Sequence, residues 1–296
     1  DKNENKEKKG RGVSHSKIIL MGEHSVVYGY PAIAIPLKNI RMECIVERAT
    51  VPFVHNKKDT LSTAIYTALN YLNRKNENIK YKVISDIPPK RGMGSSAAVS
   101  IAAIRGVLDY FNTEVDNLTL EKLVNEAEII AHNTPSGLDA KTCLSDSAIK
   151  FIKNKGFKNL EMNLGAYLLI ADTGIHGHTR DAIMNIKNMG GRALPMLEKL
   201  GKLTEETEKF IEEKDVINIG KNMISAHGEL KKLGVSIEKS DVLVKTAIDE
   251  GAYGAKMSGG GLGGCIIALM ESKEKAEMTG KKLMEKGAVN IWIEAL

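Results

Sequence analysis

The stretch that decides the fold is Pro88-Pro89-Lys90-Arg91-Gly92-Met93-Gly94-Ser95-Ser96-Ala97-Ala98. Residues 81–85 before it alternate in polarity and include β-branched side chains, a pattern typical of a strand. After it, apolar residues recur at helical spacing from Ala97 to Phe111, which predicts a helix that begins near Ser95. We therefore expect a strand, a glycine-rich loop and the N-terminus of a helix.

A loop of this kind favours an anion. Glycine permits positive φ and lets a ligand approach the backbone closely. The first N–H groups of a helix have no partner within the helix, and together with the helix dipole they favour a bound phosphate. Ser95 and Ser96 add hydroxyl groups that can reach a phosphate oxygen or a magnesium ion, and Arg91 adds a positive charge. The sequence thus predicts a phosphate-binding loop.

Two other interpretations of the loop compete with this one. A glycine-serine loop before a helix can be a plain turn with a serine N-cap. The stretch also fits G-x-G-x-x-A, a weak dinucleotide-binding pattern. Against the dinucleotide interpretation, Pro88 and Pro89 separate strand from loop, and no acidic residue ends a second strand about 20 residues further on. A Walker A loop is not expected, because no Gly-Lys-Ser/Thr follows.

Length and composition limit the classes of protein. A chain of 296 residues with 43% hydrophobic and 27% charged residues is typical of a soluble globular protein with one large domain or two moderate ones. The apolar runs are too short to span a bilayer, and we expect no signal peptide and a cytoplasmic protein. A net charge of +5 is too mild to indicate nucleic acid as a partner.

Residues 1–12 are charged and lack apolar periodicity, so we expect a disordered tail.

Three stretches carry a family resemblance. Lys17-x-x-Leu20-x-Gly22-Glu23-His24-x-Val26-Val27-x-Gly29-x-Pro31-Ala32 resembles the first signature of the mevalonate kinases, which belong to the GHMP superfamily of small-molecule kinases. The stretch from Pro88 to Ala98 resembles the superfamily's ATP-phosphate loop, and Ala255 to Cys265 resembles its third signature. Taken alone, a Glu-His pair after a strand is more often a surface turn than a site.

The resemblance implies an α+β fold with two domains and the active site in the cleft between them. We expect an N-terminal ATP-binding α/β domain over residues 1–164 and a C-terminal ferredoxin-like α/β domain over 165–296. The strand pattern over 166–171 opens the second domain, and residues 150–165 read as a polar connection.

Glu128 stands out in a predicted helix that we expect Thr119 to cap. Leu120, Val124 and Glu128 fall on one i,i+4 line, which places the carboxylate on or at the edge of the buried stripe. A carboxylate there costs several kcal/mol unless it is paired or binds a metal. The residues alone leave open whether its partner is a Lys, an Arg or a metal.

The segment from His132 to Asp139 is similar to the family's His-Gly-x-Pro-Ser-Gly-x-Asp, with Asn133 in place of the usual glycine. Taken alone, an Asp after Ser-Gly is most often a turn residue. By resemblance Asp139 is the catalytic carboxylate, and Glu128, eleven residues earlier, binds magnesium together with Ser96.

The remaining site residues also follow from the resemblance. In the family a threonine of Ser-Thr-Arg approaches the substrate; here Thr179 fits and His178 departs from the pattern. The implied catalytic residues are Asp139 and Lys17. The implied ATP-binding residues are Pro89, Arg91, Gly92, Met93, Gly94, Ser95, Ser96 and Ala97. The implied substrate-binding residues are Lys17, Glu23, His24, Thr179, Gly260 and Gly261.

The implied activity is Mg²⁺-dependent transfer of the γ-phosphoryl group of ATP to the 5-hydroxyl of (R)-mevalonate, an early step of isoprenoid biosynthesis. Alternatives are another GHMP kinase acting on phosphomevalonate or homoserine, a non-catalytic sensor on the same fold, and a nicotinamide-dependent oxidoreductase. Mevalonate and ATP are the expected partners, without nucleic acid or membrane. A homodimer is compatible with the resemblance, and the sequence leaves the oligomeric state open.

Overall fold

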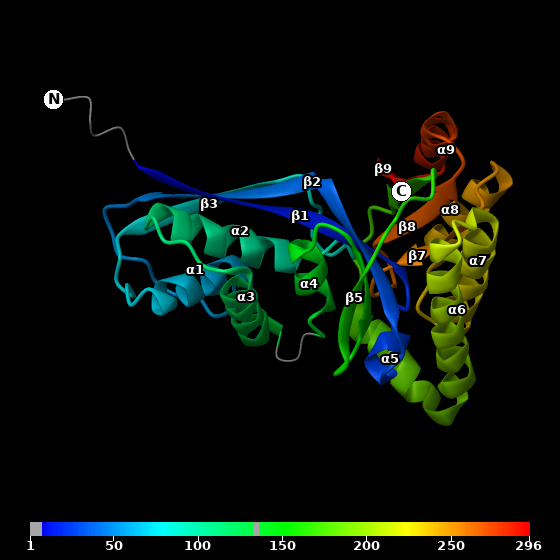
Figure 1. Cartoon of the computed structure of the whole chain (residues 1–296), viewed down its shortest axis with the longest axis horizontal. Coiled ribbons are helices and arrows are strands. Elements are labelled where there is room, and N and C mark those ends of the chain that lie inside the picture. The colour runs from blue at the N-terminus through cyan, green and yellow to red at the C-terminus, as the bar shows by residue number, and fades with distance from the viewer. Residues whose placement is uncertain (1–7, 133–135) are drawn as a thin grey trace. The chain divides into compact units, whose positions relative to one another are not determined.

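The computed structural model describes residues 8–132 and 136–296 (Figure 1). Residues 1–7 of the predicted tail over 1–12, and the Asn133 departure, lie outside these residues. The elements are β1 (Lys9–Met21), η1 (Ser25–Tyr28), β2 (Ala32–Arg48), α1 (Thr60–Tyr71), β3 (Ile79–Ser85), α2 (Ser95–Tyr110), α3 (Asn117–His132), α4 (Leu138–Leu144), β4 (Ala148–Ile152), β5 (Gly156–Leu160), β6 (Tyr167–Asp172), α5 (Thr179–Met189), η2 (Gly190–Ala193), α6 (Leu194–Glu212), α7 (Val216–Lys232), α8 (Glu238–Asp249), β7 (Gly254–Ser258), β8 (Cys265–Met270), α9 (Lys273–Glu285) and β9 (Asn290–Ala295).

The chain forms two compact units, each built from separate segments. Unit 1 comprises residues 1–17, 36–88 and 94–146, and unit 2 comprises 18–35, 89–93 and 147–296. The mixture of helices and sheets confirms the α+β class. The predicted division into 1–164 and 165–296 stays a prediction.

In unit 1, helices cover one side of a sheet. β2 pairs antiparallel with β3 from Met42 opposite Ser85 to Arg48 opposite Ile79. The helix α2 contacts α1, α3 and α4, and its buried face includes Ile101 and Ile104 (Figure 1). The predicted helix start at Ser95 is confirmed. The predicted cap at Thr119 is wrong, because α3 begins at Asn117 and Asp116 Oδ1 accepts the Thr119 N–H at 2.7 Å.

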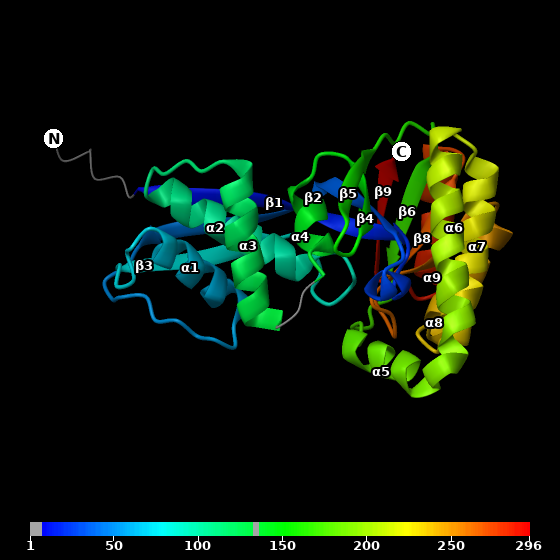
Figure 2. The ribbon, with the colours of Figure 1, turned by 60° about the horizontal axis from the view of Figure 1, so that its bottom comes forward.

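Unit 2 contains a four-stranded antiparallel sheet in the order β7-β8-β6-β9. The helices α8 and α9 bury Leu243 and Leu283 against apolar side chains of this sheet, among them Leu169 and Ile266. The long helices α6 and α7 run side by side, and α7 also contacts β7 (Figure 2). The predicted strand over 166–171 is confirmed as β6.

Residues 150–165, expected as a polar connection, instead contribute to a hairpin of β4 and β5. Its lysines are held by acidic side chains of α6: Lys150 Nζ lies 2.9 Å from Glu208 Oε1, and Lys158 Nζ lies 3.2 Å from Glu208 Oε2. The strands are therefore fixed through charged pairs, which apolar periodicity does not reveal. Across the described residues, a helix with the length and apolarity to cross a bilayer is not found.

The expected tail over residues 1–12 is wrong for residues 9–12, which begin β1. Gly10 and Gly12 are buried against α2. A Cβ on Gly10 would lie 2.3 Å from the carbonyl oxygen of Gly106, and a Cβ on Gly12 would lie 2.0 Å from that of Ala102. The strand packs so closely on the helix that only glycine fits, so its buried face carries no apolar pattern that could have predicted it.

We predict that Gly12→Ala lowers the melting temperature by several degrees. The added methyl group overpacks the contact between β1 and α2, which costs about 1–3 kcal/mol. Gly191→Ala is the control, because a Cβ at Gly191 meets no heavy atom within 4 Å. Thermal unfolding followed by circular dichroism compares the two. Equal melting temperatures for both variants and the wild type would contradict the close contact.

Candidate functional site

The N-terminus of α2 in unit 1 is shaped by Gly94. This residue is the N-cap and has a left-handed backbone with φ 74°. A Cβ there would lie 2.8 Å from Cγ of Lys17 and 3.0 Å from Sγ of Cys143, so a larger residue would both strain and crowd the turn. The alternative of a serine N-cap is wrong. A glycine cap has no side chain that could accept the first N–H groups of α2.

Lys17 lies beside this helix end. It is only 2% exposed, and its Nζ is 2.8 Å from Oδ1 of Asp139 in α4. A buried ammonium group is costly unless a carboxylate pairs with it. Burial and, to a lesser extent, the charge of Asp139 raise the pKa of the neighbouring Cys143 thiol, so this sulfur stays protonated and unreactive. The structure thus brings the two predicted catalytic residues together.

Glu128 extends the same region of unit 1. It is 6% exposed, which confirms the predicted place on the buried stripe of α3. The Ser100 hydroxyl donates to its Oε1 at 2.8 Å, and the Ser96 hydroxyl lies 3.3 Å from the same oxygen. The predicted pair Ser96 and Glu128 is therefore adjacent. A carboxylate beside a hydroxyl is an oxygen donor set that suits a hard divalent cation.

In unit 2, Arg91 holds the loop segment 89–93. Its Nε donates to Asp172 Oδ1 at 2.7 Å, at the end of β6. Its Nη1 donates to the Pro89 carbonyl oxygen at 3.1 Å and to Nδ1 of His176 at 2.7 Å. The guanidinium group predicted to contact ATP is thus engaged within the protein. Sequence reasoning missed Asp172, although an aspartate at the end of an apolar strand was a visible signal.

Four of the predicted substrate-binding residues gather in unit 2 around the glycine run after β7. The His24 ring Nε2 lies 2.8 Å from the carbonyl oxygen of Gly260. A Cβ on Gly260 would lie 2.0 Å from Oγ1 of Thr179, so only glycine fits beside the threonine. A pocket here is lined by Lys90, Gly92, Gly177, Thr179, Ser258, Gly260, Gly261, Gly263 and Gly264. The fourth residue of the group, Gly261, is part of this lining.

Glu23 has a different environment. Its carboxylate forms an ion pair with Lys256 of β7, and both residues are almost completely buried, at 2% and 0% exposure. Burial lowers the pKa of Lys256, and the attraction of Glu23 opposes this effect. Lys256 is a residue that sequence reasoning missed. The feature of the sequence that could have identified it is a lysine within a strand of otherwise small or apolar residues. The glycine run directly follows this strand.

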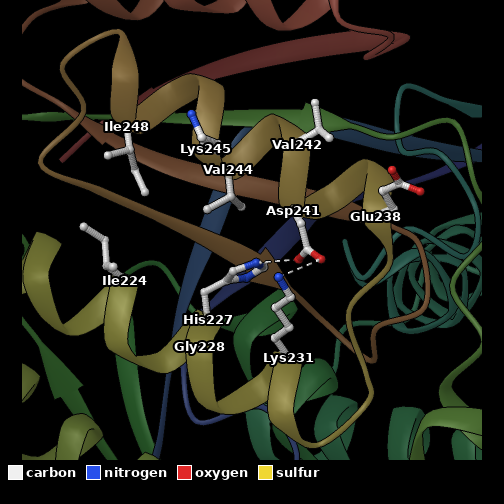
Figure 3. Close-up of a pocket in the computed structure, with 10 residues that line it drawn as sticks. All are labelled: Ile224, His227, Gly228, Lys231, Glu238, Asp241, Val242, Val244, Lys245 and Ile248. Atoms are coloured by element: carbon white, nitrogen blue, oxygen red, sulfur yellow. Dashed lines mark hydrogen bonds and ion pairs between the residues drawn. The ribbon is translucent and has the colours of Figure 1, made fainter.

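A larger pocket between α7 and α8 contains none of the predicted residues (Figure 3). In it, Nε2 of His227 lies 2.9 Å from Oδ1 of Asp241. The backbone N–H of Met257 donates to Nδ1 of His227 at 3.1 Å, so the ring proton must lie on Nε2. Burial is the main cause that lowers the pKa of His227. His227 of α7 therefore holds the backbone of β7 at Met257, and Asp241 fixes the ring orientation of His227.

Comparison with known proteins decides the family. The family described as GHMP kinases N terminal domain matches residues 62–146, and the one described as GHMP kinases C terminal matches residues 207–287. A curated mevalonate kinase from Pyrococcus furiosus is 32% identical, over 90% of this chain and 91% of its own length. The chain belongs to the GHMP kinases.

Solved GHMP kinase structures agree in fold. The crystal structure of L. major mevalonate kinase in complex with R-mevalonate has a TM-score of 0.86 at 24% identity and covers 97% of this chain and 95% of its own. Mevalonate kinase from methicillin-resistant Staphylococcus aureus has a TM-score of 0.79 at 29% identity, with coverages of 98% and 99%. The two-domain GHMP kinase fold predicted from the sequence is confirmed.

Proposed function

We propose that this chain transfers the γ-phosphoryl group of ATP to the 5-hydroxyl of (R)-mevalonate. The observation that carries the proposal is the ion pair between buried Lys17 and half-exposed Asp139, 2.8 Å apart, beside the N-terminus of α2. It occurs in a GHMP kinase whose relative from Pyrococcus furiosus, 32% identical over nearly its whole length, is named mevalonate kinase. A carboxylate and an ammonium group next to a phosphate-binding helix end are the groups that this transfer requires.

The phosphate groups of ATP are bound by backbone rather than by side chains. Met93 and Ala97 have almost completely buried side chains, so they can offer only backbone groups to a nucleotide. The N–H groups from Ser95 to Ala97 and the dipole of α2 bind phosphate oxygens. Pro89, Gly92 and Gly94 shape the loop. We assign Arg91 an indirect part in ATP binding, because its hydrogen bond to Asp172 fixes residues 89–93.

The family's use of ATP implies a divalent metal, and we assign Mg²⁺ to Ser96 and Glu128. The Ser96 hydroxyl and Glu128 Oε1 lie 3.3 Å apart and supply the hard oxygen ligands that this ion prefers. Mg²⁺ takes few protein ligands and completes its shell with phosphate oxygens and water, so two residues are enough. The bound ion supplies charge neutralisation for the β- and γ-phosphates.

The reaction itself uses Asp139 and Lys17. Asp139 is half exposed at its side chain and can accept the proton of an incoming hydroxyl, or orient that hydroxyl. The Lys17 ammonium group stabilises the negative charge that develops on the attacking oxygen. Because phosphoryl transfer needs little covalent chemistry from the protein, these positions and charges carry the catalysis.

Polar groups within unit 2 recognise the acceptor. His24, Thr179 and the backbone at Gly260 and Gly261 provide hydrogen-bonding groups for the carboxylate and tertiary hydroxyl of mevalonate. The charge of Glu23 is already engaged with Lys256, so we assign it an indirect part in this recognition. The homodimer and the cytoplasmic location stay predictions.

The first test is the choice of acceptor. ADP release by the purified protein with MgATP is measured for mevalonate, phosphomevalonate, homoserine and galactose. We expect kcat/KM for mevalonate to exceed the others by at least about 100-fold, because a site that hydrogen-bonds its substrate rejects analogues that lack the matching groups. Equal or better turnover of another acceptor would replace this function with that of a sister kinase, and the absence of turnover with all four would favour a sensor.

The second test concerns the metal. Glu128→Gln keeps the shape of the side chain and removes its charge, so we expect a several-fold higher Mg²⁺ requirement and a lower kcat. Glu126→Gln is the matched control, because Glu126 is exposed on the same helix. Activity is titrated against Mg²⁺ at saturating substrates. Identical titration curves for the two variants would make Glu128 a structural residue.

A further inference from the structure

The ion pair between Lys256 and Glu23 is buried without an obvious structural need. Lys256 is 0% exposed and Glu23 is 2% exposed. Besides the carboxylate, Lys256 Nζ donates to the carbonyl oxygen of Met257 at 2.7 Å. Desolvation of two charges is expensive, and apolar residues of similar volume commonly replace such a pair without loss of stability. The pair is therefore weak evidence for stability and invites another explanation.

The pair joins two segments that both carry predicted substrate contacts. One is the region Ile19–Ser25, which holds Glu23 and His24, and the other is β7 with its glycine run. Ser258 Oγ donates to the carbonyl oxygen of Ile19 at 2.7 Å, and His24 contacts Gly260. The ion pair between Glu23 and Lys256 is a third link. All three connect the same two segments of unit 2 and hold them in one relative position.

His24 has an unusual backbone conformation within this arrangement. It has φ 66° and ψ −47°, a backbone region that residues other than glycine rarely adopt and that persists only where the surroundings enforce it. The contact of Nε2 with the Gly260 carbonyl oxygen requires a proton on Nε2. Within the described part of the chain, Nδ1 of His24 makes no hydrogen bond. This nitrogen is a lone-pair acceptor in the neutral ring.

The charges around His24 favour the neutral ring. Burial is the main cause that lowers the pKa of His24, and the positive charge of Lys256 lowers it further, whereas the Gly260 carbonyl acts in the opposite direction. A neutral imidazole with its proton on Nε2 cannot donate a hydrogen bond from Nδ1 to a carboxylate. It can accept one from a hydroxyl group of the substrate.

We propose that Lys256 is a positioning residue that acts through Glu23 to hold His24 with its proton on Nε2 and its Nδ1 available as acceptor for a substrate hydroxyl. The proposal rests on the proposed function for the identity of that hydroxyl, the tertiary hydroxyl of mevalonate. In this proposal Glu23 supports the position of His24 and does not itself contact the substrate. It also explains why a charged pair stands where an apolar pair would fit.

The kinetic experiment uses Lys256→Met and the double variant Lys256→Met/Glu23→Leu, which replaces the ion pair with apolar side chains. Lys275→Met is the control, because Lys275 pairs with Glu271 on the surface. We expect both test variants to raise the KM for mevalonate at least tenfold, while the dissociation constant of ATP changes less than twofold and the control matches the wild type. The double variant should unfold at a temperature close to that of the wild type.

The double variant separates positioning from stability. If it regains both the wild-type melting temperature and the wild-type KM for mevalonate, the pair is only structural and the proposal is overturned. If it regains stability while KM stays raised, the proposal is supported. It also keeps the test valid should the single variant fail to fold, since it leaves no unpaired buried charge.

A second readout needs no acceptor. Long-range ¹H–¹⁵N NMR of the imidazole rings at pH 8 identifies the protonated nitrogen of His24, with the signal assigned by its loss in His24→Gln. We expect a fixed Nε2–H form in the wild type and an average of both tautomers in the double variant. The same fixed form in both proteins would overturn the proposal. If the wild type does not phosphorylate mevalonate, the proposed function fails, and this spectrum still decides the role of Lys256.

Discussion

The buried ammonium group of Lys17 is the constraint on which the candidate catalytic region depends. A lysine at 2% exposure must have a carboxylate nearby, and Asp139 supplies it at 2.8 Å. The lysine chain passes so close to the start of α2 that position 94 has no room for a Cβ. The same glycine leaves the helix N-terminus without a side-chain cap. One packing arrangement thus places an ammonium group, a carboxylate and the N-terminus of α2 together in unit 1.

Unit 2 repeats this principle with a second lysine. Lys17 and Lys256 are the two largest fully buried side chains of the described residues, and each lies close to a carboxylate and a glycine-rich turn. Displacement of either lysine would separate a buried charge from its carboxylate partner, which is costly. Each buried lysine therefore holds two distant segments of the chain together beside a glycine-rich turn. Arg91 likewise holds residues 89–93 through its ion pair with Asp172.

The sequence predicted most of this arrangement where its patterns were strong. Helical spacing and glycine content placed the start of α2, and the periodicity of α3 predicted the burial of Glu128. Other features carried no such pattern. The first residues of β1 bury glycine and serine instead of apolar side chains, and β4 and β5 are fixed by lysine pairs to α6, so both were misjudged. The partners of Glu23 and Arg91 depend on contacts between distant segments, which spacing along the chain does not report.

The central claim is that Lys17 and Asp139 act as one catalytic unit, and a double-mutant cycle on kcat tests it most directly. Lys17→Met, Asp139→Asn and the double variant are compared with the wild type at saturating MgATP and mevalonate, after circular dichroism shows that each is folded. General-base help is worth about 10²–10⁴-fold, so we expect each single variant to lose that order of activity. Because the two groups serve one proton and one developing charge, the double variant should be no more than a few-fold slower than the worse single variant. Losses that multiply in the double variant would contradict the account.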